Sequence, residues 1–248
     1  MKKVIYSLLA IFSLITFATS ARDITGSDAQ KIIAGAEKIK MSATSSVPEF
    51  IKLREGSEIP FSQFEKWSKQ NLKLAANSGF KLLNSSTDKI GVMHYRYQQT
   101  INNIPVEGTM YLLHVKNNLI TSLNGTLFDK INAASIPVVT KAAALNNALQ
   151  NVNATLYRWQ VAGWEQQIKK TENNPFATWY PKGELVYAPS NGKYASANYH
   201  LCYKFDVYAQ EPLSRQYIFV DAQSGQIIYK QNRIQDGNAI GTDRKSVV

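Results

Sequence analysis

The sequence predicts an α+β protein made of two tandem units, each a helix packed on a curved antiparallel sheet. A helical pattern followed by short strands rich in β-branched and aromatic residues occurs twice, starting at Phe61 and again at Thr140. Residues 133–138 separate the two patterns and are expected to be a linker. The chain has 248 residues, 44% of them apolar, which is enough for one large domain or two small ones of roughly 100 residues each.

The beginning of the chain is predicted to direct export. Residues 1–20 contain two lysines, an apolar core at Val4–Phe17 and a small-residue cleavage site, so a signal peptide is expected to be cut between Ser20 and Ala21. The apolar core is shorter than the roughly 20 residues that a membrane-spanning helix needs. We therefore expect a secreted or periplasmic protein with no membrane partner once the signal is removed.

Residues 21–60 are polar and rich in serine and alanine. A helical pattern over Asp28–Ile39 is weak. A loosely held leader is therefore expected between the signal and the first unit.

The first unit is predicted to cover residues 61–132. Phe61, Phe64 and Trp67 recur at helical spacing, which predicts a short amphipathic helix over Phe61–Leu74. An antiparallel meander is expected to follow, with strands at Lys81–Leu83, Gly91–Gln99, Val106–Val115 and Leu119–Leu127. Its turns are expected at the polar groups Asn84-Ser85-Ser86, Asn102-Asn103 and Asn117-Asn118.

The second unit is predicted over residues 133–236. Thr140 is expected to cap a helix whose apolar face consists of Ala142, Leu145, Ala148, Leu149 and Val152. Residues 155–182, with three tryptophans, are expected to be irregular. The expected strands are Gly183–Tyr187, Ala197–Ala209, Gln216–Val220 and Gln226–Lys230, the last two joined as a hairpin by the turn Asp221–Gly225.

The single cysteine and the net charge exclude some classes of protein. Cys202 is the only cysteine, so the chain has no disulfide framework. A nucleophilic thiol would need a neighbouring base and an orienting group, and the alternation around Cys202 supplies neither, which favours a structural role. The net charge is +10, but its lysines and arginines are scattered. A solvated surface is therefore expected rather than a nucleic-acid site.

The segment Met93–Val115 raises the question of a metal or catalytic site, because it contains His94, Glu107 and His114. If Asn102-Asn103 is a two-residue turn, His94 faces Tyr111 and Arg96 faces Thr109. The two histidines then lie on opposite faces of the hairpin and cannot bind one metal. A bulge at Pro105–Gly108 would invert the second strand and reverse that conclusion.

Motifs for known chemistry are absent from the sequence. It contains no His-Glu-x-x-His, no paired Cys-x-x-Cys, no phosphate-binding glycine loop and no Gly-x-Ser-x-Gly. A Ser/His/Asp arrangement dispersed along the chain stays open. We expect no catalytic residue, no bound cofactor and no metal site in this chain.

Two groups of residues resemble a known kind of propeptide. The first, similar to the fungalysin/thermolysin propeptide (FTP) motif, consists of Met93–Gln99, Ile104–Gly108, His114-Val115 and Ser122–Gly125. The second, similar to the closing hairpin of a PepSY domain, consists of Val220–Ala222 and Ser224–Ile228. The residues that carry the resemblance are His94, Tyr95, Arg96, Tyr97, Gln98, Gln99, Pro105, Val106, Gly108, Asn124, Gly125, Asp221 and Gly225.

The resemblance implies the pro-region of a secreted thermolysin-like zinc metallopeptidase, with an FTP-like unit followed by a PepSY-like unit and cystatin-like or PepSY-like sheets. In that family the pro-region assists folding of the catalytic domain, inhibits it in cis and is removed by cleavage. The zinc belongs to the catalytic domain. The alternatives are a stand-alone secreted module that inhibits proteases in trans, and an anion-binding surface protein suggested by the net charge.

The last residues depart from this resemblance. Residues 237–242 resemble the junction before a mature peptidase domain, which is missing from the sequence. Residues 243–248 match one reading frame of a common sequencing adapter and are expected to be a non-native tail. The chain is therefore expected to be the front part of a longer precursor.

Overall fold

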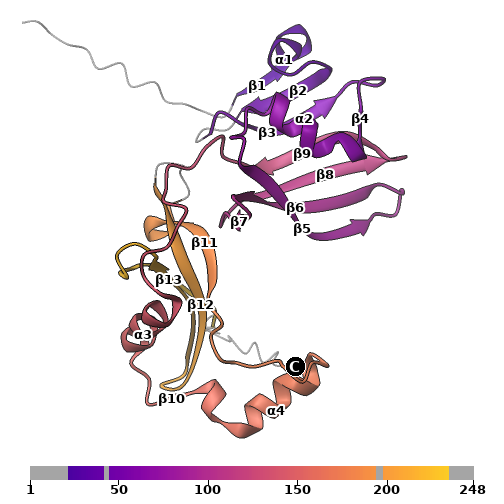
Figure 1. The fold of residues 1–248 in the computed structure, drawn as a ribbon. Coiled ribbons are helices and arrows are strands. Elements are labelled where there is room, and N and C mark those ends of the chain that lie inside the picture. Colours follow the sequence, from indigo (N-terminus) through magenta and orange to yellow (C-terminus); the bar gives the residue numbers. More distant parts are fainter. Residues whose placement is uncertain (1–21, 42–44, 194–197, 235–248) are drawn as a thin grey trace, which may run out of the picture.

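The computed structural model describes residues 22–41, 45–193 and 198–234. In this part of the chain, two antiparallel sheets with a few short helices follow one another (Figure 1). The α+β class predicted from the sequence is therefore confirmed. The signal peptide, its cleavage between Ser20 and Ala21, the junction 237–242 and the tail 243–248 lie outside the described residues and stay predictions.

The first sheet has nine strands among the described residues, in the order β1-β2-β3-β9-β8-β6-β5, with β4 beside β9 and β7 beside β6. They are β1 (Asp23–Thr25), β2 (Ala36–Met41), β3 (Pro48–Leu53), β4 (Ile59–Pro60), β5 (Ser78–Thr87), β6 (Met93–Ile101), β7 (Ile104–Pro105), β8 (Met110–Lys116) and β9 (Leu119–Thr126). The turns at Asn102-Asn103 and Asn117-Asn118 are confirmed. All four asparagines have positive φ, as two-residue hairpin turns require.

The expectation of a loosely held leader is wrong. Residues 23–60 supply four strands of the first sheet, and the weak helical pattern resolves into a short helix α1 (Gly26–Ile32) followed by β2. Ala29, Ile39 and Ile51 are fully buried. The local signal is weak because lysines and glutamates alternate with these apolar residues. They are buried in one core with Ile120 and Leu123 of β9, far away in the sequence, with which β3 pairs.

The predicted helix after Pro60 is confirmed as a 3₁₀ turn η1 (Phe61–Gln63) that continues into α2 (Phe64–Asn71). Phe64 is buried against the sheet, with its ring centroid 4.6 Å from that of Phe80. The predicted turn at Asn84-Ser85-Ser86 is wrong, because these residues pair with β6 inside β5. Polar residues are tolerated there because β5 is an edge strand and Leu82–Thr87 are exposed.

The second sheet has the order β10-β12-β13-β14, with β11 beside β12. Its strands are β10 (Leu156–Tyr157), β11 (Glu184–Pro189), β12 (Tyr199–Glu211), β13 (Ser214–Asp221) and β14 (Ile227–Asn232), and a 3₁₀ turn η3 (Ser190–Gly192) follows β11. All four predicted strands and the turn Asp221–Gly225 are confirmed. No helix within the described residues is long and apolar enough to cross a membrane.

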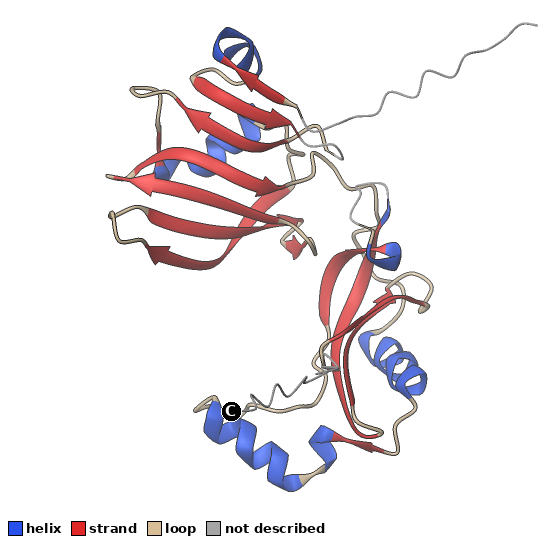
Figure 2. Cartoon of the chain, turned by 180° about the vertical axis from the view of Figure 1, so that it is seen from behind, coloured by secondary structure: helices blue, strands red, loops and turns tan. Residues whose placement is uncertain are grey.

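Two helices accompany the second sheet (Figure 2). The helix α3 (Lys141–Val152) begins as predicted, because Thr140 Oγ1 accepts a hydrogen bond from the Ala143 amide at 3.2 Å. It packs through Ala144, Leu145 and Ala148, whereas Ala142, predicted to face the core, is exposed.

The expectation that residues 155–182 are irregular is wrong in part. They contain β10, the 3₁₀ turn η2 (Arg158–Gln160) and the helix α4 (Ala162–Thr171). Trp164 and Ile168 lie one helical turn apart, and Ile168 is buried. Trp159 contacts Tyr157 and Tyr180 within the segment, and Trp179 contacts Tyr208 of β12, so aromatic contacts that the local pattern does not show help to order these residues.

Candidate functional site

The hairpin formed by β6, β7 and β8 changes register along its length. Near the turn Thr100 pairs with Pro105, as predicted, but farther along Tyr97 pairs with Tyr111 instead of His94. Between these two pairs β6 advances three residues and the opposite strand six. The opposite strand therefore contains three extra residues, and because this number is odd, its side chains switch to the other face of the sheet. As a result His94 lies directly opposite His114. The prediction that the two histidines occupy opposite faces is therefore wrong.

The bulge that causes this inversion lies at Val106–Thr109 and is held by hydrogen bonds. The buried hydroxyl of Thr109 donates to Val106 O at 2.7 Å and accepts from the Gln99 amide at 3.1 Å. The Val106 amide donates to Gln99 O at 2.9 Å. Gly108 has φ +76°, a conformation that glycine adopts without strain. A glycine three residues after Pro105 is the only local signal for the bulge.

The Gln99 side chain connects this hairpin to the end of the first sheet. It is fully buried; its Nε2 donates to Phe128 O at 2.7 Å, and its Oε1 accepts from the Phe128 amide at 2.9 Å. Both backbone groups of Phe128 are thus satisfied away from water.

Tyr95 and Tyr97 point into the core of the first unit, and Phe61 stacks on Tyr95 with centroids 4.3 Å apart. Burial raises the pKa of the Tyr97 hydroxyl. Arg96 and Gln98 lie on the opposite face, where they bond Asn84 Oδ1 and Val106 O, each at 3.2 Å.

His94 and His114 belong to a row of four polar side chains on that same open face. His94 Nε2 lies 3.1 Å from Asp88 Oδ2, the two Nδ1 atoms lie 2.8 Å apart, and His114 Nε2 lies 2.7 Å from Asn124 Oδ1. Hydrogen bonds to the carboxylate hold the pKa of Asp88 below its usual range, chiefly that of the Val92 amide. The sequence did not indicate Asp88, which lies in the turn before β6.

The bulge also joins the two units. Val106 forms a parallel bridge with Tyr187, and the Glu107 amide donates to Tyr187 O at 2.8 Å. Tyr199 Oη donates to Glu107 O at 2.7 Å, and Lys204 Nζ contacts Glu107 Oε1 at 2.9 Å. The motif residues Pro105 to Gly108 thus shape the first sheet and contact the second.

The turn after β13 is organised by Asp221. Its Oδ1 accepts hydrogen bonds from the amides of Gln223 and Ser224 at 2.8 and 2.7 Å, and its Oδ2 lies 2.9 Å from His200 Nδ1. Burial alone would raise the pKa of Asp221, but the hydrogen bonds from Ser224, Gln223 and His200 together lower it. Gly225 ends the turn with φ +77°.

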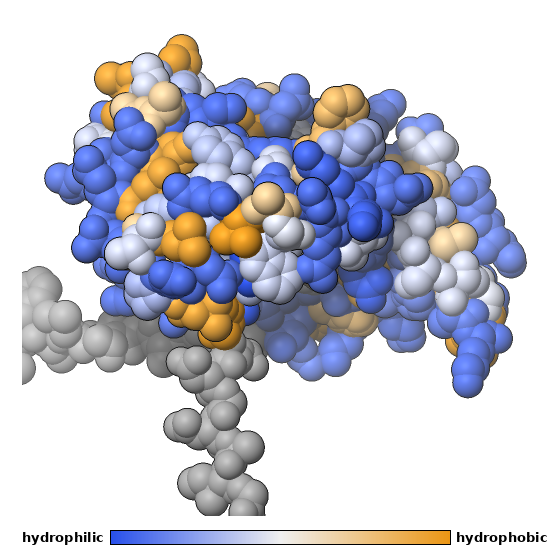
Figure 3. All heavy atoms as spheres, turned by 90° about the horizontal axis from the view of Figure 1, so that it is seen from below, coloured by the Kyte–Doolittle hydropathy of each residue, from blue (hydrophilic) through white to orange (hydrophobic). Residues whose placement is uncertain are grey.

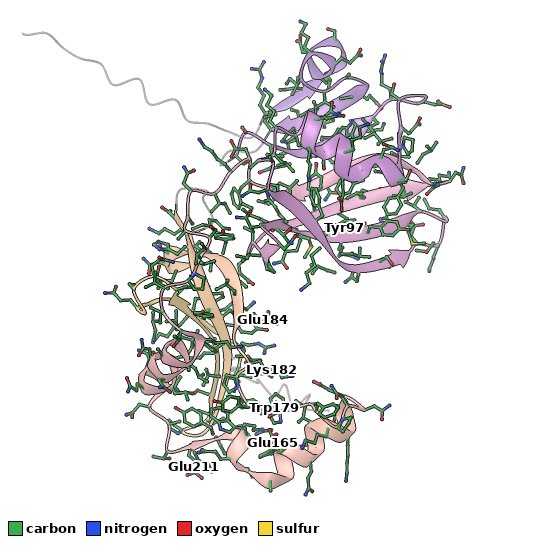
Figure 4. The ribbon with its side chains drawn as sticks, in the orientation of Figure 1. Tyr97, Glu165, Trp179, Lys182, Glu184 and Glu211 are labelled. Atoms are coloured by element: carbon green, nitrogen blue, oxygen red, sulfur yellow. The ribbon has the colours of Figure 1, made fainter. Side chains whose placement is uncertain are left out.

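A groove of about 410 Å³ lies between α4 and the open face of the second sheet. Trp179, Lys182 and Glu184 lie in succession along this side of the second unit (Figure 4). Beside the groove, Arg215 bonds both Asp206 oxygens, at 3.0 and 2.7 Å, and its guanidinium lies 5.0 Å from the Trp179 ring centroid. No local pattern predicts this groove, because its walls come from separate segments of the chain.

Charged and polar side chains dominate the surface around the second unit. Hydrophilic residues cover most of the face seen from below, and the hydrophobic patches there are small and separate (Figure 3). This distribution agrees with the scattered charges of the sequence.

The thiol of Cys202 lies in the interior of the second unit. Cys202 is fully buried, and burial raises the pKa of its thiol, which keeps it protonated. Among residues 22–41, 45–193 and 198–234, no group of three or more His, Cys, Asp or Glu side chains could hold a metal ion.

Residues 78–127 match the family model described as the Fungalysin/Thermolysin Propeptide Motif. They carry the propeptide motif. The matched residues begin with β5 and end just after β9, and they include the bulge, Gln99 and the two facing histidines. The hairpin that the sequence suggested as a metal or catalytic site is therefore the centre of the propeptide motif.

Similar proteins extend the likeness beyond the propeptide motif. The chain is 27% identical over 214 residues to Bacillolysin of Bacillus amyloliquefaciens, covering 83% of this chain and 38% of that protein. It is 24% identical over 184 residues to Bacillolysin of Bacillus subtilis (strain 168), covering 73% and 32%. With the Thermostable neutral protease NprT of Geobacillus stearothermophilus, the identity is 27% over 166 residues, covering 64% and 26%.

The chain thus spans 26 to 38% of the length of these relatives. Together with the propeptide motif, they support a thermolysin-like propeptide region. Among solved structures, the Bacillus megaterium YpeB C-terminal domain is similar with a TM-score of 0.34 and 11% identity, covering 79% of this chain and 76% of that chain. That likeness is too low to support a conclusion about the fold.

Proposed function

We propose that this chain is the pro-region of a secreted thermolysin-like zinc metallopeptidase. It assists folding of the catalytic domain, covers its cleft and is removed by cleavage. The observation that carries the proposal is the propeptide motif at residues 78–127 in a chain whose relatives are far longer than itself. The remaining length of those relatives is where the proposal places the catalytic domain and its zinc, and this chain contributes no metal ligand.

The described fold suits an inhibitor that acts through surface complementarity rather than a reactive group. A stable protein interface buries on the order of 1,600 Å². Two sheets held together at Glu107 could present such an area from both units at once, with their relative orientation already set. Inhibition in this proposal depends on the folded state of both sheets.

The test is to mix the full chain with active thermolysin-like peptidases and measure hydrolysis of a peptide substrate. The expected result is saturable inhibition at equimolar chain, and faster recovery of activity when denatured peptidase is refolded with the chain present. A basic protein of similar size and charge is the control for non-specific electrostatic binding. Failure to inhibit or to assist refolding of any such peptidase, including one encoded downstream in the same gene, would overturn the proposal.

A further inference from the structure

The four polar side chains across the open face of the first sheet form a continuous hydrogen-bonded row. Asp88 comes from the turn before β6, His94 from β6, His114 from β8 and Asn124 from β9. The row therefore joins three neighbouring segments of the sheet and one turn through side chains. His94 is 21% exposed, so solvent protons can reach the row while the surrounding strands restrict how its rings move.

The geometry sets the number of protons in the row. Each Nε2 atom faces an acceptor oxygen, of Asp88 or Asn124, so each carries a hydrogen. The two Nδ1 atoms face each other at 2.8 Å, a hydrogen-bond distance. Two neutral rings would place two lone pairs against each other there. A bond at this distance needs one proton between the rings, which gives the pair a single positive charge.

Charged neighbours favour one proton over two. Among the described residues, Asp88 is the one carboxylate that contacts the pair, and it balances a single positive charge. The register and side-chain alternation place four cationic residues on the same face of the surrounding strands, namely Lys52, Lys81, Arg96 and Lys116, of which Lys52 is paired with Glu37 at 2.9 Å. A second proton would create two cations in contact, with these further cations around them.

We propose that His94 and His114 share one proton, and that this makes the centre of the propeptide motif sensitive to pH. Proton uptake from water forms the Nδ1–H···Nδ1 bond between β6 and β8. Release of that proton, or binding of a second, breaks it. The proton sharing itself does not depend on the function proposed above. Its expected consequence does rest on that function: a change of pH loosens the pro-region and favours release of the peptidase.

The sign of the pH dependence follows from proton linkage. On the alkaline side the folded pair holds one proton that the unfolded chain has released, so stability is lost as the pH rises. On the acidic side the unfolded histidines bind two protons and the folded pair one, so stability is lost as the pH falls. Because stability is lost in both directions, a maximum is expected between the two losses.

The test compares the free energy of unfolding of the full chain from pH 5 to 9 with that of His114→Gln. The wild-type folding constant should fall by up to about tenfold more per pH unit than that of the variant on either side of the maximum. His200→Gln is the matched control, because His200 also faces a carboxylate but no second histidine. Parallel curves for wild type and His114→Gln would overturn the proposal.

A second measurement needs no variant. Nitrogen-15 NMR of the histidine rings in the wild-type chain should show a proton on both Nε2 atoms and one proton shared by the two Nδ1 atoms. If the Asn124 amide instead donates to His114 Nε2, one Nδ1 carries a full proton, the other none, and the pair is neutral. That result would contradict the proposal even if the pair affects stability.

Discussion

Gln99 is a buried polar residue whose hydrogen bonds stabilise the first sheet. Its amide pairs with both backbone groups of Phe128, twenty-nine residues later, and water cannot replace it. The same residue accepts the Val106 amide through its backbone. A glutamine that the sequence alone would place at the surface therefore connects the bulge to the end of the first sheet.

We expect Gln99→Leu to lower the free energy of unfolding by about 2–4 kcal/mol, because it leaves two buried backbone groups without partners. Urea unfolding followed by circular dichroism measures this. Gln98→Leu is the matched control: its bond to Val106 O is part-buried, and a loss of about 1 kcal/mol or less is expected. Equal losses for both variants would contradict the role given to burial.

Gly125 is required by close contact between strands. It has φ +135°, and a Cβ at this position would lie 1.9 Å from Met110 O. Gly125→Ala must displace β8 from β9. Its free energy of unfolding, measured by urea unfolding, is therefore expected to fall by roughly 3–5 kcal/mol.

Gly91→Ala separates the effect of backbone strain from that of the close contact, because Gly91 also has positive φ but a Cβ there would meet nothing within 4 Å. The free energy of unfolding of Gly91→Ala should fall by only ~1–2 kcal/mol, which is the strain of the left-handed backbone. A Gly125→Ala variant no less stable than Gly91→Ala would show that β8 and β9 separate easily.

At the scale of elements, bulges and turns decide which side chains meet. The bulge at Val106–Thr109 brings His94 and His114 together, and the turn after β13 places Asp221 beside His200. Both depend on glycines and short polar residues in the loop. The sequence indicated the turns at Asn102-Asn103 and Asp221–Gly225, but not the number of extra residues in the bulge.

Asp221→Asn tests the turn after β13 through its pH dependence. The folded chain lowers the pKa of Asp221, so its charge stabilises the fold above the unfolded value of about 4, and this contribution is lost as the pH falls through the lower folded value. Asparagine can still accept the turn hydrogen bonds but does not titrate. The stability advantage of wild type over Asp221→Asn should therefore shrink between about pH 5 and 2. An advantage that stays constant would exclude the charge as its source.

At the scale of the whole molecule, the segment after Asn103 connects the two sheets. Val106 bridges to Tyr187, and the ion pair of Glu107 with Lys204 is mostly shielded, its side chains 20% and 18% exposed. Shielding from water makes such a pair stronger than one at the surface. The orientation of the two units therefore depends on residues of the propeptide motif.

A double-mutant cycle with Glu107→Gln and Lys204→Met should give a coupling energy of about 1–2 kcal/mol. X-ray scattering should show a wider range of orientations in the double variant. The pair Asp28–Lys31, whose side chains are 70% and 75% exposed, is the control and should give a coupling near zero. Equal coupling energies for the two pairs would mean that the ion pair of Glu107 with Lys204 does not stabilise the contact between the units.

The sequence by itself determined what depends on neighbouring residues. It indicated the cap at Thr140, the asparagine turns, the alternating strand around Cys202 and the hairpin at Asp221–Gly225, because each follows from local backbone preferences. The residues of the propeptide motif were also evident without a structure.

Only the tertiary structure decided what depends on pairing between distant segments. The strands β1 to β4 belong to the first sheet because β3 pairs with β9, and an odd number of bulge residues turns His94 and His114 toward each other. The groove beside Trp179 likewise combines α4 with β12 and β13. Local preferences cannot specify these contacts, because a shift of one residue in strand pairing moves every side chain to the other face.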